Sequence, residues 1–212
     1  MLASFGYEVV RFDLESGDWE SIEPLSGIDT ACMVEASDNA LWFGGDGGVL
    51  RYDPDSGNWQ RFEVGTQQIP SWKVTAIVED GDTFWFGTYD AGAILYDGAN
   101  WETWAVEDGL GCNEIYAIQQ DGSGALWLLH PGSGLSRYDP QRETWQTFGS
   151  EEGAVDWPSS PGVDSDGVLW IGEYETLTQY KDGAWQSSSF PYLEDTSTVS
   201  YTHLTLPTKR IV

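Results

Sequence analysis

Short apolar runs alternate along the chain with turns that are rich in Gly, Asp and Asn. The segment 41–59, LWFGGDGGVLRYDPDSGNW, contains an apolar run, a glycine turn, a second run, an aspartate-rich turn and the start of a third run. The same order returns at 84–101, 126–145 and 169–185. No segment shows the apolar period of 3.6 residues that an amphipathic helix requires. The pattern therefore predicts a repeated β-structure with very little helix.

Aromatic residues give this repeat a period of about 42 residues. Trp42, Trp85, Trp127 and Trp170 are 43, 42 and 43 residues apart. Two further aromatic series keep a similar spacing: Trp19, Trp59, Trp101, Trp145 and Trp185, and Phe12, Tyr52, Tyr96, Tyr138 and Tyr180. A period of this length with tight turns is typical of propeller blades.

One unit of the repeat is interpreted as four antiparallel strands. They are expected at Val74–Val78, at Phe84–Gly87, at Ala93–Tyr96 and from Trp101 onward, with Asp-Gly turns between them. We predict an all-β fold, a partial β-propeller of four-stranded antiparallel blades, with the recurrent aromatics buried between neighbouring blades.

The period also predicts where the units begin and end. Arg11-Phe12-Asp13 aligns with Arg51-Tyr52-Asp53, which places the start of the chain on the second strand of a blade. Units open near residues 1, 41, 84, 126 and 169, giving about four and a half blades. Residues 1–197 are therefore expected to form an incomplete propeller whose ring does not close.

The last residues depart from the repeat. The stretch 199–208, VSYTHLTLPT, resembles an in-frame translation of the transposon-end adaptor used in sequencing libraries, and 209–212 would be read-through beyond it. We expect residues 198–212 to be a non-native tail that is not part of the repeat fold. The alternative is a true terminal strand, because TVSYTHLTL has a high β-propensity.

Composition narrows the possible partners. Nine Lys and Arg residues stand against 35 Asp and Glu residues, giving a formal charge of -26. Such a surface excludes nucleic acid as a partner and makes anionic membranes poor partners. No window reaches the roughly 20 apolar residues of a membrane-spanning helix, and the two cysteines, Cys32 and Cys112, cannot form a disulfide scaffold.

Several motifs of the repeat resemble the two-component regulator propeller family. They are Ala76-Ile77-Val78-Glu79-Asp80-Gly81, Phe84-Trp85-Phe86-Gly87-Thr88, Leu135-Ser136-Arg137-Tyr138-Asp139-Pro140 and Asp108-Gly109-Leu110-Gly111-Cys112-Asn113. The resemblance implies a ligand-sensing module in the periplasm or outside the cell, of the kind attached to histidine kinases and implicated in glycan sensing. Repeats of this family also occur in secreted propellers with no kinase attached, so the resemblance is compatible either with a secreted protein or with a kinase or membrane domain in the rest of the gene.

Ligand-binding candidates come from the loops between second and third strands and from the connections between blades, which are expected at the same end of the sheets. Aromatic rings, carboxylates and amides suit a small-molecule or glycan ligand, since a sugar stacks on an aromatic ring while its hydroxyls need polar partners. The candidates are Trp72, Tyr89, Asp90, Asn113, Glu114, His130, Trp157, Glu173 and Tyr174.

Two other function classes stay open. His130 is the candidate general base of a propeller enzyme similar to the lyases that act on streptogramin B antibiotics, and paired carboxylates could serve a glycosidase. The third alternative is a platform for protein interactions. No cofactor is expected, although Asp53 and Asp55, and likewise Asp164 and Asp166, imitate the start of a calcium loop without its terminal Glu.

Overall fold

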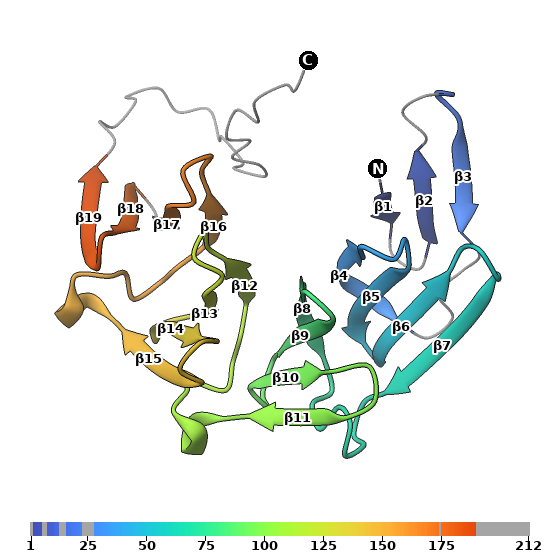
Figure 1. The fold of residues 1–212 in the computed structure, drawn as a ribbon, viewed down its shortest axis with the longest axis horizontal. Coiled ribbons are helices and arrows are strands. Elements are labelled where there is room, and N and C mark those ends of the chain that lie inside the picture. The colour runs from blue at the N-terminus through green and yellow to red at the C-terminus, as the bar shows by residue number, and fades with distance from the viewer. Residues whose placement is uncertain (1, 6–7, 13–15, 23–27, 174, 190–212) are drawn as a thin grey trace. The chain divides into compact units, whose positions relative to one another are not determined.

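The computed structural model describes residues 2–5, 8–12, 16–22, 28–173 and 175–189 (Figure 1). These residues form β-strands joined by turns, together with two short 3-10 helices, Val106–Asp108 (η1) and Ser150–Glu152 (η2). Each sheet is an antiparallel meander, and in none of the five does the last strand pair with the first. The prediction of an all-β partial propeller is confirmed. Tyr174 and the predicted tail, 198–212, lie outside the described residues.

The chain divides into two compact units. The first contains the described residues up to Ala105 together with Asn113–Ile115, and the second contains Val106–Cys112 together with the described residues from Tyr116 onward. No helix among the described residues is long and apolar enough to cross a bilayer.

The first unit contains three sheets, which we call blades 1, 2 and 3. Blade 1 has three strands: β1 (Leu2–Phe5), β2 (Glu8–Phe12) and β3 (Trp19–Ile22). Blade 2 has four: β4 (Asp29–Glu35), β5 (Leu41–Asp46), β6 (Gly48–Asp53) and β7 (Asn58–Glu63). Blade 3 also has four: β8 (Val74–Asp80), β9 (Thr83–Thr88), β10 (Ala93–Tyr96) and β11 (Trp101–Trp104).

The second unit contains blades 4 and 5. Blade 4 consists of β12 (Ala117–Gln120), β13 (Leu126–His130), β14 (Gly134–Asp139) and β15 (Thr144–Phe148). Blade 5 consists of β16 (Ser160–Val163), β17 (Leu169–Glu173), β18 (Thr176–Lys181) and β19 (Ala184–Ser189). The strands of blade 3 agree with those that the repeat predicts at 74–78, 84–87, 93–96 and from residue 101.

Aromatic side chains fill the space between blades 2 and 3. Trp42 is almost completely buried, and its ring centroid lies 4.4 Å from that of Phe84 and 6.0 Å from that of Tyr96, both in the next blade. Phe62 of β7 packs on Trp101 at 4.8 Å. Burying an aromatic side chain of this size stabilises the fold by a few kcal/mol before conformational entropy is subtracted.

The same packing joins blades 4 and 5. Trp127 is fully buried, and its ring meets Tyr180 and Trp185 of the next blade at 4.8 and 5.5 Å. Leu169 and Ile171 complete this core from β17. Trp42 and Trp127 therefore have the inter-blade packing role that their spacing predicts. The prediction is wrong for Trp19 and Trp59 of the second aromatic series, whose side chains are 60% and 38% exposed.

Neighbouring blades are also joined at the turns between their first and second strands. The carboxylate of Glu79 in blade 3 accepts the N–H of Ser37 at 2.9 Å and its hydroxyl at 2.6 Å. In the second unit, the N–H of Gly122 donates to the carbonyl of Gly167 at 3.0 Å. These turns lie at one end of each meander, while the turns between second and third strands and the blade connections lie at the other end.

Candidate functional site

Two exposed aromatic side chains lie side by side at the connection end of blade 3. Trp72, from the connection before β8, is 49% exposed, and Tyr89, from the turn between β9 and β10, is 44% exposed. Their ring centroids are 5.1 Å apart and their planes meet at 60°. The backbone fixes both positions, because the carbonyl of Trp72 accepts the N–H of Gly47 at 3.4 Å and the N–H of Tyr89 donates to the carbonyl of Lys73 at 3.1 Å.

A buried serine holds a carboxylate beside this pair. Ser71 is only 1% exposed, and its hydroxyl donates a hydrogen bond to Asp90 Oδ1 while accepting the N–H of Lys73 at 3.2 Å. Asp90 itself is exposed. A hydrogen bond to a charged acceptor is stronger than a neutral one, so the orientation of the carboxylate is set before any ligand arrives.

The cationic member of the group is Lys73. Its Nζ lies 3.1 Å from Asp46 Oδ1 and 5.7 Å from the centroid of the Trp72 ring. The ion pair keeps the ammonium group near the aromatic face. We call Asp46, Ser71, Trp72, Lys73, Tyr89 and Asp90 the Trp72 cluster; all six belong to the first unit. It combines two aromatic faces with oriented hydrogen-bond donors and acceptors.

Asn113 and Glu114 are half-buried and lie in the same unit. The carbonyl of Asn113 accepts the N–H of Gly92 at 2.9 Å, as the carbonyl of Trp72 accepts that of Gly47. In the second unit the carbonyl of Asp156 accepts the N–H of Gly134 at 3.2 Å. Trp72, Asn113 and Asp156 therefore occupy equivalent positions in successive blade connections.

Trp157 and Glu173 form a second, smaller group. Trp157 is 57% exposed, and its N–H donates to Glu173 Oε1 at 2.8 Å. Its indole lies against Gly132, where an added Cβ would come within 3.0 Å of the ring. The structure thus brings together Trp72, Tyr89 and Asp90 in one unit, and Trp157 with Glu173 in the other. Tyr174 is not among the described residues.

His130 has no exposed surface. Its Nε2 lies 2.7 Å from Ser136 Oγ, which accepts the N–H of Gly111 at 2.9 Å. The imidazole therefore belongs to a buried polar contact between β13, β14 and the preceding connection. Direct contact between this ring and a ligand would require movement of the surrounding backbone.

The carboxylates of the calcium candidates bind donors of their own turns. Asp53 accepts the N–H groups of Asp55 and Ser56 and the Ser56 hydroxyl at 2.7 Å, and this hydroxyl is the main cause of the lowered pKa of Asp53. Asp164 accepts the N–H groups of Asp166 and Val168 and the indole N–H of Trp170 at 2.8 Å, and the indole contributes most to its lowered pKa. No cluster of three or more His, Cys, Asp or Glu side chains suited to a metal occurs in the described part of the chain.

Three members of the Trp72 cluster are absent from the sequence-based candidates: Asp46, Ser71 and Lys73. Ser71 and Lys73 are the sequence neighbours of Trp72, a tryptophan outside the three periodic aromatic series. This adjacency is the sequence feature that could have identified them. Asp46 ends β5 in the preceding blade, and Asp46 and Lys73 are connected by an isolated antiparallel β-bridge. A contact between different blades has no local sequence signature.

No protein-family model matches this sequence, and no curated protein matches it. Among solved structures, the chain is similar to the extracellular domain of the putative hybrid two-component system BT4673 from B. thetaiotaomicron, with a TM-score of 0.75, 21% identity and coverage of 90% of this chain and 29% of that one. The corresponding domain of BT3049 from the same organism gives a TM-score of 0.68 at 20% identity, covering 90% of this chain and 28% of that one.

A third similar structure is catalytically inactive H270A virginiamycin B lyase from Staphylococcus aureus with quinupristin. It matches with a TM-score of 0.71 and 16% identity, over 88% of this chain and 64% of that one. At these identities the similarities establish the fold. The chain spans less than a third of the length of the BT4673 and BT3049 domains.

Proposed function

We propose that this chain is a ligand-binding module of a larger extracytoplasmic sensor protein, and that it recognises a saccharide at the Trp72 cluster. The observation that carries the proposal is the pairing of two exposed aromatic rings, Trp72 and Tyr89, next to a carboxylate that buried Ser71 holds in place. The similarity to the extracellular domains of putative two-component systems supports the sensor assignment and the location outside the cytoplasm.

The chemistry of the cluster fits a pyranose ring. The apolar face of the sugar would stack on Trp72 or Tyr89, and ring hydroxyls would donate to Asp90 and accept from Lys73. Because Ser71 and Asp46 fix these two charged groups, less side-chain entropy is lost on binding. Exposed aromatics without such neighbours would suit a hydrophobic partner instead.

The test is a glycan-array screen with the full chain, followed by titration calorimetry with the best saccharide. Trp72→Ala should weaken binding by at least about tenfold, as expected for a central aromatic contact. Ser71→Ala should weaken it less, because it releases Asp90 without removing any ligand contact. Trp157→Ala is the matched control, since it removes an exposed tryptophan of the other unit and should leave the affinity unchanged.

Two results would contradict the proposal: no saccharide binding above background, or binding that Trp72→Ala leaves intact. Loss of binding in Trp157→Ala alone would move the saccharide site to the second unit. Circular dichroism of each variant would show that the fold is retained.

A further inference from the structure

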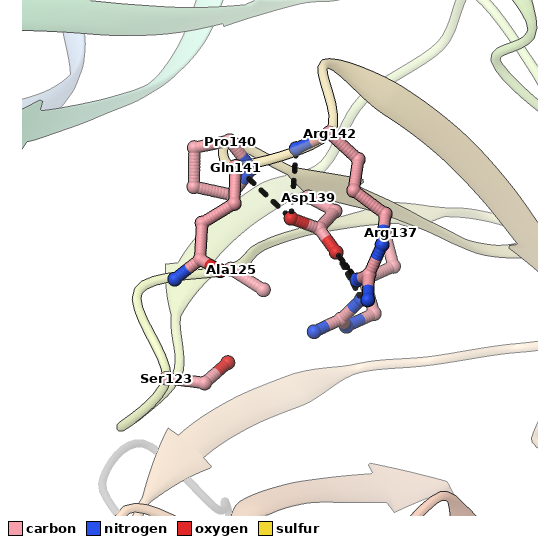
Figure 2. Close-up of a pocket in the computed structure, with 7 residues that line it drawn as sticks. All are labelled: Ser123, Ala125, Arg137, Asp139, Pro140, Gln141 and Arg142. Carbon is pink, nitrogen blue, oxygen red and sulfur yellow. Dashed lines mark hydrogen bonds and ion pairs between the residues drawn. The ribbon is translucent and has the colours of Figure 1, made fainter.

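A pocket of about 170 Å³ opens in blade 4 at the end opposite to the blade connections (Figure 2). It lies between the turn that joins β12 to β13 and the turn that joins β14 to β15. The residues that line it are Ser123, Ala125, Arg137, Asp139, Pro140, Gln141 and Arg142. Two of the nine basic residues of a strongly acidic chain therefore line one small pocket.

Blade 2 also has an arginine at this position of the repeat, opposite its tryptophan, and there a carboxylate binds it. There Arg51 lies over Trp42, with 5.8 Å from Cζ to the ring, and its Nη2 donates to Asp38 Oδ2 at 2.8 Å. Arg137 holds the same position in blade 4, where its Cζ lies 5.6 Å from the centroid of the Trp127 ring. The carboxylate of Asp38 thus occupies, in blade 2, the side of the guanidinium that faces the first turn.

Two substitutions change the pocket in blade 4. Ser123 precedes Trp127 by four residues, as Asp38 precedes Trp42, so a short neutral side chain replaces the carboxylate. Arg142 follows Asp139 by three residues, as Ser56 follows Asp53, and it donates to Asp139 Oδ2 where Ser56 donates to Asp53 Oδ2. Compared with the equivalent region of blade 2, blade 4 therefore has one carboxylate fewer and one guanidinium more.

The charged side chains that line the pocket are Arg137, Arg142 and Asp139, and together they carry a net charge of +1. Asp139 is engaged by Arg142 and by the N–H groups of Gln141 and Arg142, while Arg137 Nη1 is 3.9 Å away from its Oδ2. The Nε of Arg137 is buried and has no hydrogen-bond partner. The Arg137 side chain is 20% exposed and lines the pocket, so an anion bound there would interact with the charge of a guanidinium that still has an unused donor.

We propose that this pocket binds the carboxylate group of a small organic anion, which takes the place that Asp38 occupies in blade 2. The pocket is smaller than the roughly 300 Å³ of the smallest typical small-molecule sites, so it would hold an acidic group rather than a whole ligand. Arg137 and Arg142 bind the carboxylate oxygens, and the Ser123 hydroxyl lies at the rim. The site is independent of the Trp72 cluster, which belongs to the other unit.

Neighbouring charge limits the affinity. The formal charge of -26 repels anions at low salt, and Asp121 lies in the same turn as Ser123. Both Asp121 oxygens are engaged by donors of that turn and by Trp127. A dissociation constant in the millimolar range is expected, corresponding to about 4 kcal/mol of binding free energy.

The experiment follows the Arg137 Nε–H resonance of the ¹⁵N-labelled full chain during titration with sodium acetate. Acetamide, which has the same shape without the charge, and sodium chloride at equal ionic strength are the ligand controls. Sodium glucuronate and glucose form a second pair of arms, which distinguishes a sugar acid from a simple carboxylate. We expect saturable shifts with acetate or glucuronate and none with acetamide or glucose.

Blade 2 supplies the substitutions. Ser123→Asp, which copies Asp38, and Arg142→Ser, which copies Ser56, should each weaken acetate binding at least fivefold. Arg61→Ser is the matched control because it removes one exposed cation of the first unit and should leave the titration unchanged. If Ser123→Asp is poorly folded, Arg142→Ser alone still tests whether acetate binds in this pocket. Shifts no larger than those with chloride, or equal weakening by Arg61→Ser, would overturn the proposal.

Discussion

The indole nitrogen of Trp127 donates a hydrogen bond to Asp121 Oδ2 at 2.8 Å. The other oxygen of Asp121 accepts the N–H groups of Ser123 and Ala125 and the Ser123 hydroxyl. One carboxylate therefore orders a turn between strands and also satisfies the polar atom of the largest buried side chain in its blade. In blade 2 the equivalent position is Ala36, and Trp42 Nε1 is buried without a hydrogen-bond partner.

Asp121→Ala, which reproduces the residue found at Ala36, should lower the free energy of unfolding by about 1–3 kcal/mol, because it leaves a buried indole N–H and several turn N–H groups without their acceptor. Urea denaturation followed by tryptophan fluorescence measures the change. Asp166→Ala is the control in the same unit, since its exposed side chain is in a similar turn; equal effects of the two substitutions would contradict the assigned role.

Gly122→Ala should destabilise the packing of blades 4 and 5. An added Cβ would lie 2.5 Å from Gly167 Cα, a backbone atom that cannot move aside without shifting its turn. We expect a loss of roughly 1–3 kcal/mol in thermal or urea unfolding. Gly172→Ala, whose Cβ would find its nearest neighbour at 3.6 Å, should change stability by no more than about 0.5 kcal/mol.

Asp97 should titrate well below an ordinary aspartate. The side chain of Asn100, followed by the N–H groups of Asn100 and Ala99, lowers its pKa from 3.8 to about 2. Because the folded pKa is depressed, the stabilising contribution is present above pH 3.8 and disappears as the pH falls toward 2. Carboxyl-carbon NMR titration measures this pKa, and Asn100→Ala should move it upward; an unchanged value would rule out the side-chain contact.

Cys32 should resist thiol reagents in the folded protein. Burial of the sulfur raises the pKa of its thiol to about 12, so the reactive thiolate is scarce at pH 8. The Sγ lies 3.5 Å from the carbonyl oxygen of Gly44. Mass spectrometry after iodoacetamide treatment should find Cys32 modified only when urea is present. Rapid modification of the native chain would contradict this packing.

The period of the tryptophans predicted most of the fold because burial between blades imposes the same residue at the same strand position each time. Trp42 and Trp127 pack as their spacing indicates. The turns also followed from local chemistry, since Asp-Gly and Asp-Pro-Asp-Ser-Gly sequences favour them directly.

The candidate site was only partly predictable. Trp72, Tyr89 and Asp90 meet because they lie in loops at the same end of neighbouring strands, which topology alone suggests. The buried Ser71 that orients Asp90 and the Asp46 partner of Lys73 depend on distances between different segments. His130 was grouped with the exposed loop residues, yet it lies at the last position of β13, where its side chain is completely buried.

The main-chain bonds at the blade connections have a consequence for evolution. At three equivalent positions the carbonyls of Trp72, Asn113 and Asp156 accept a glycine N–H, and the residue type is different each time. Since these hydrogen bonds are made by main-chain atoms, a mutation at any of the three positions can change the side chain without removing the main-chain hydrogen bond. Such positions offer a route by which new recognition surfaces diversify on an unchanged framework.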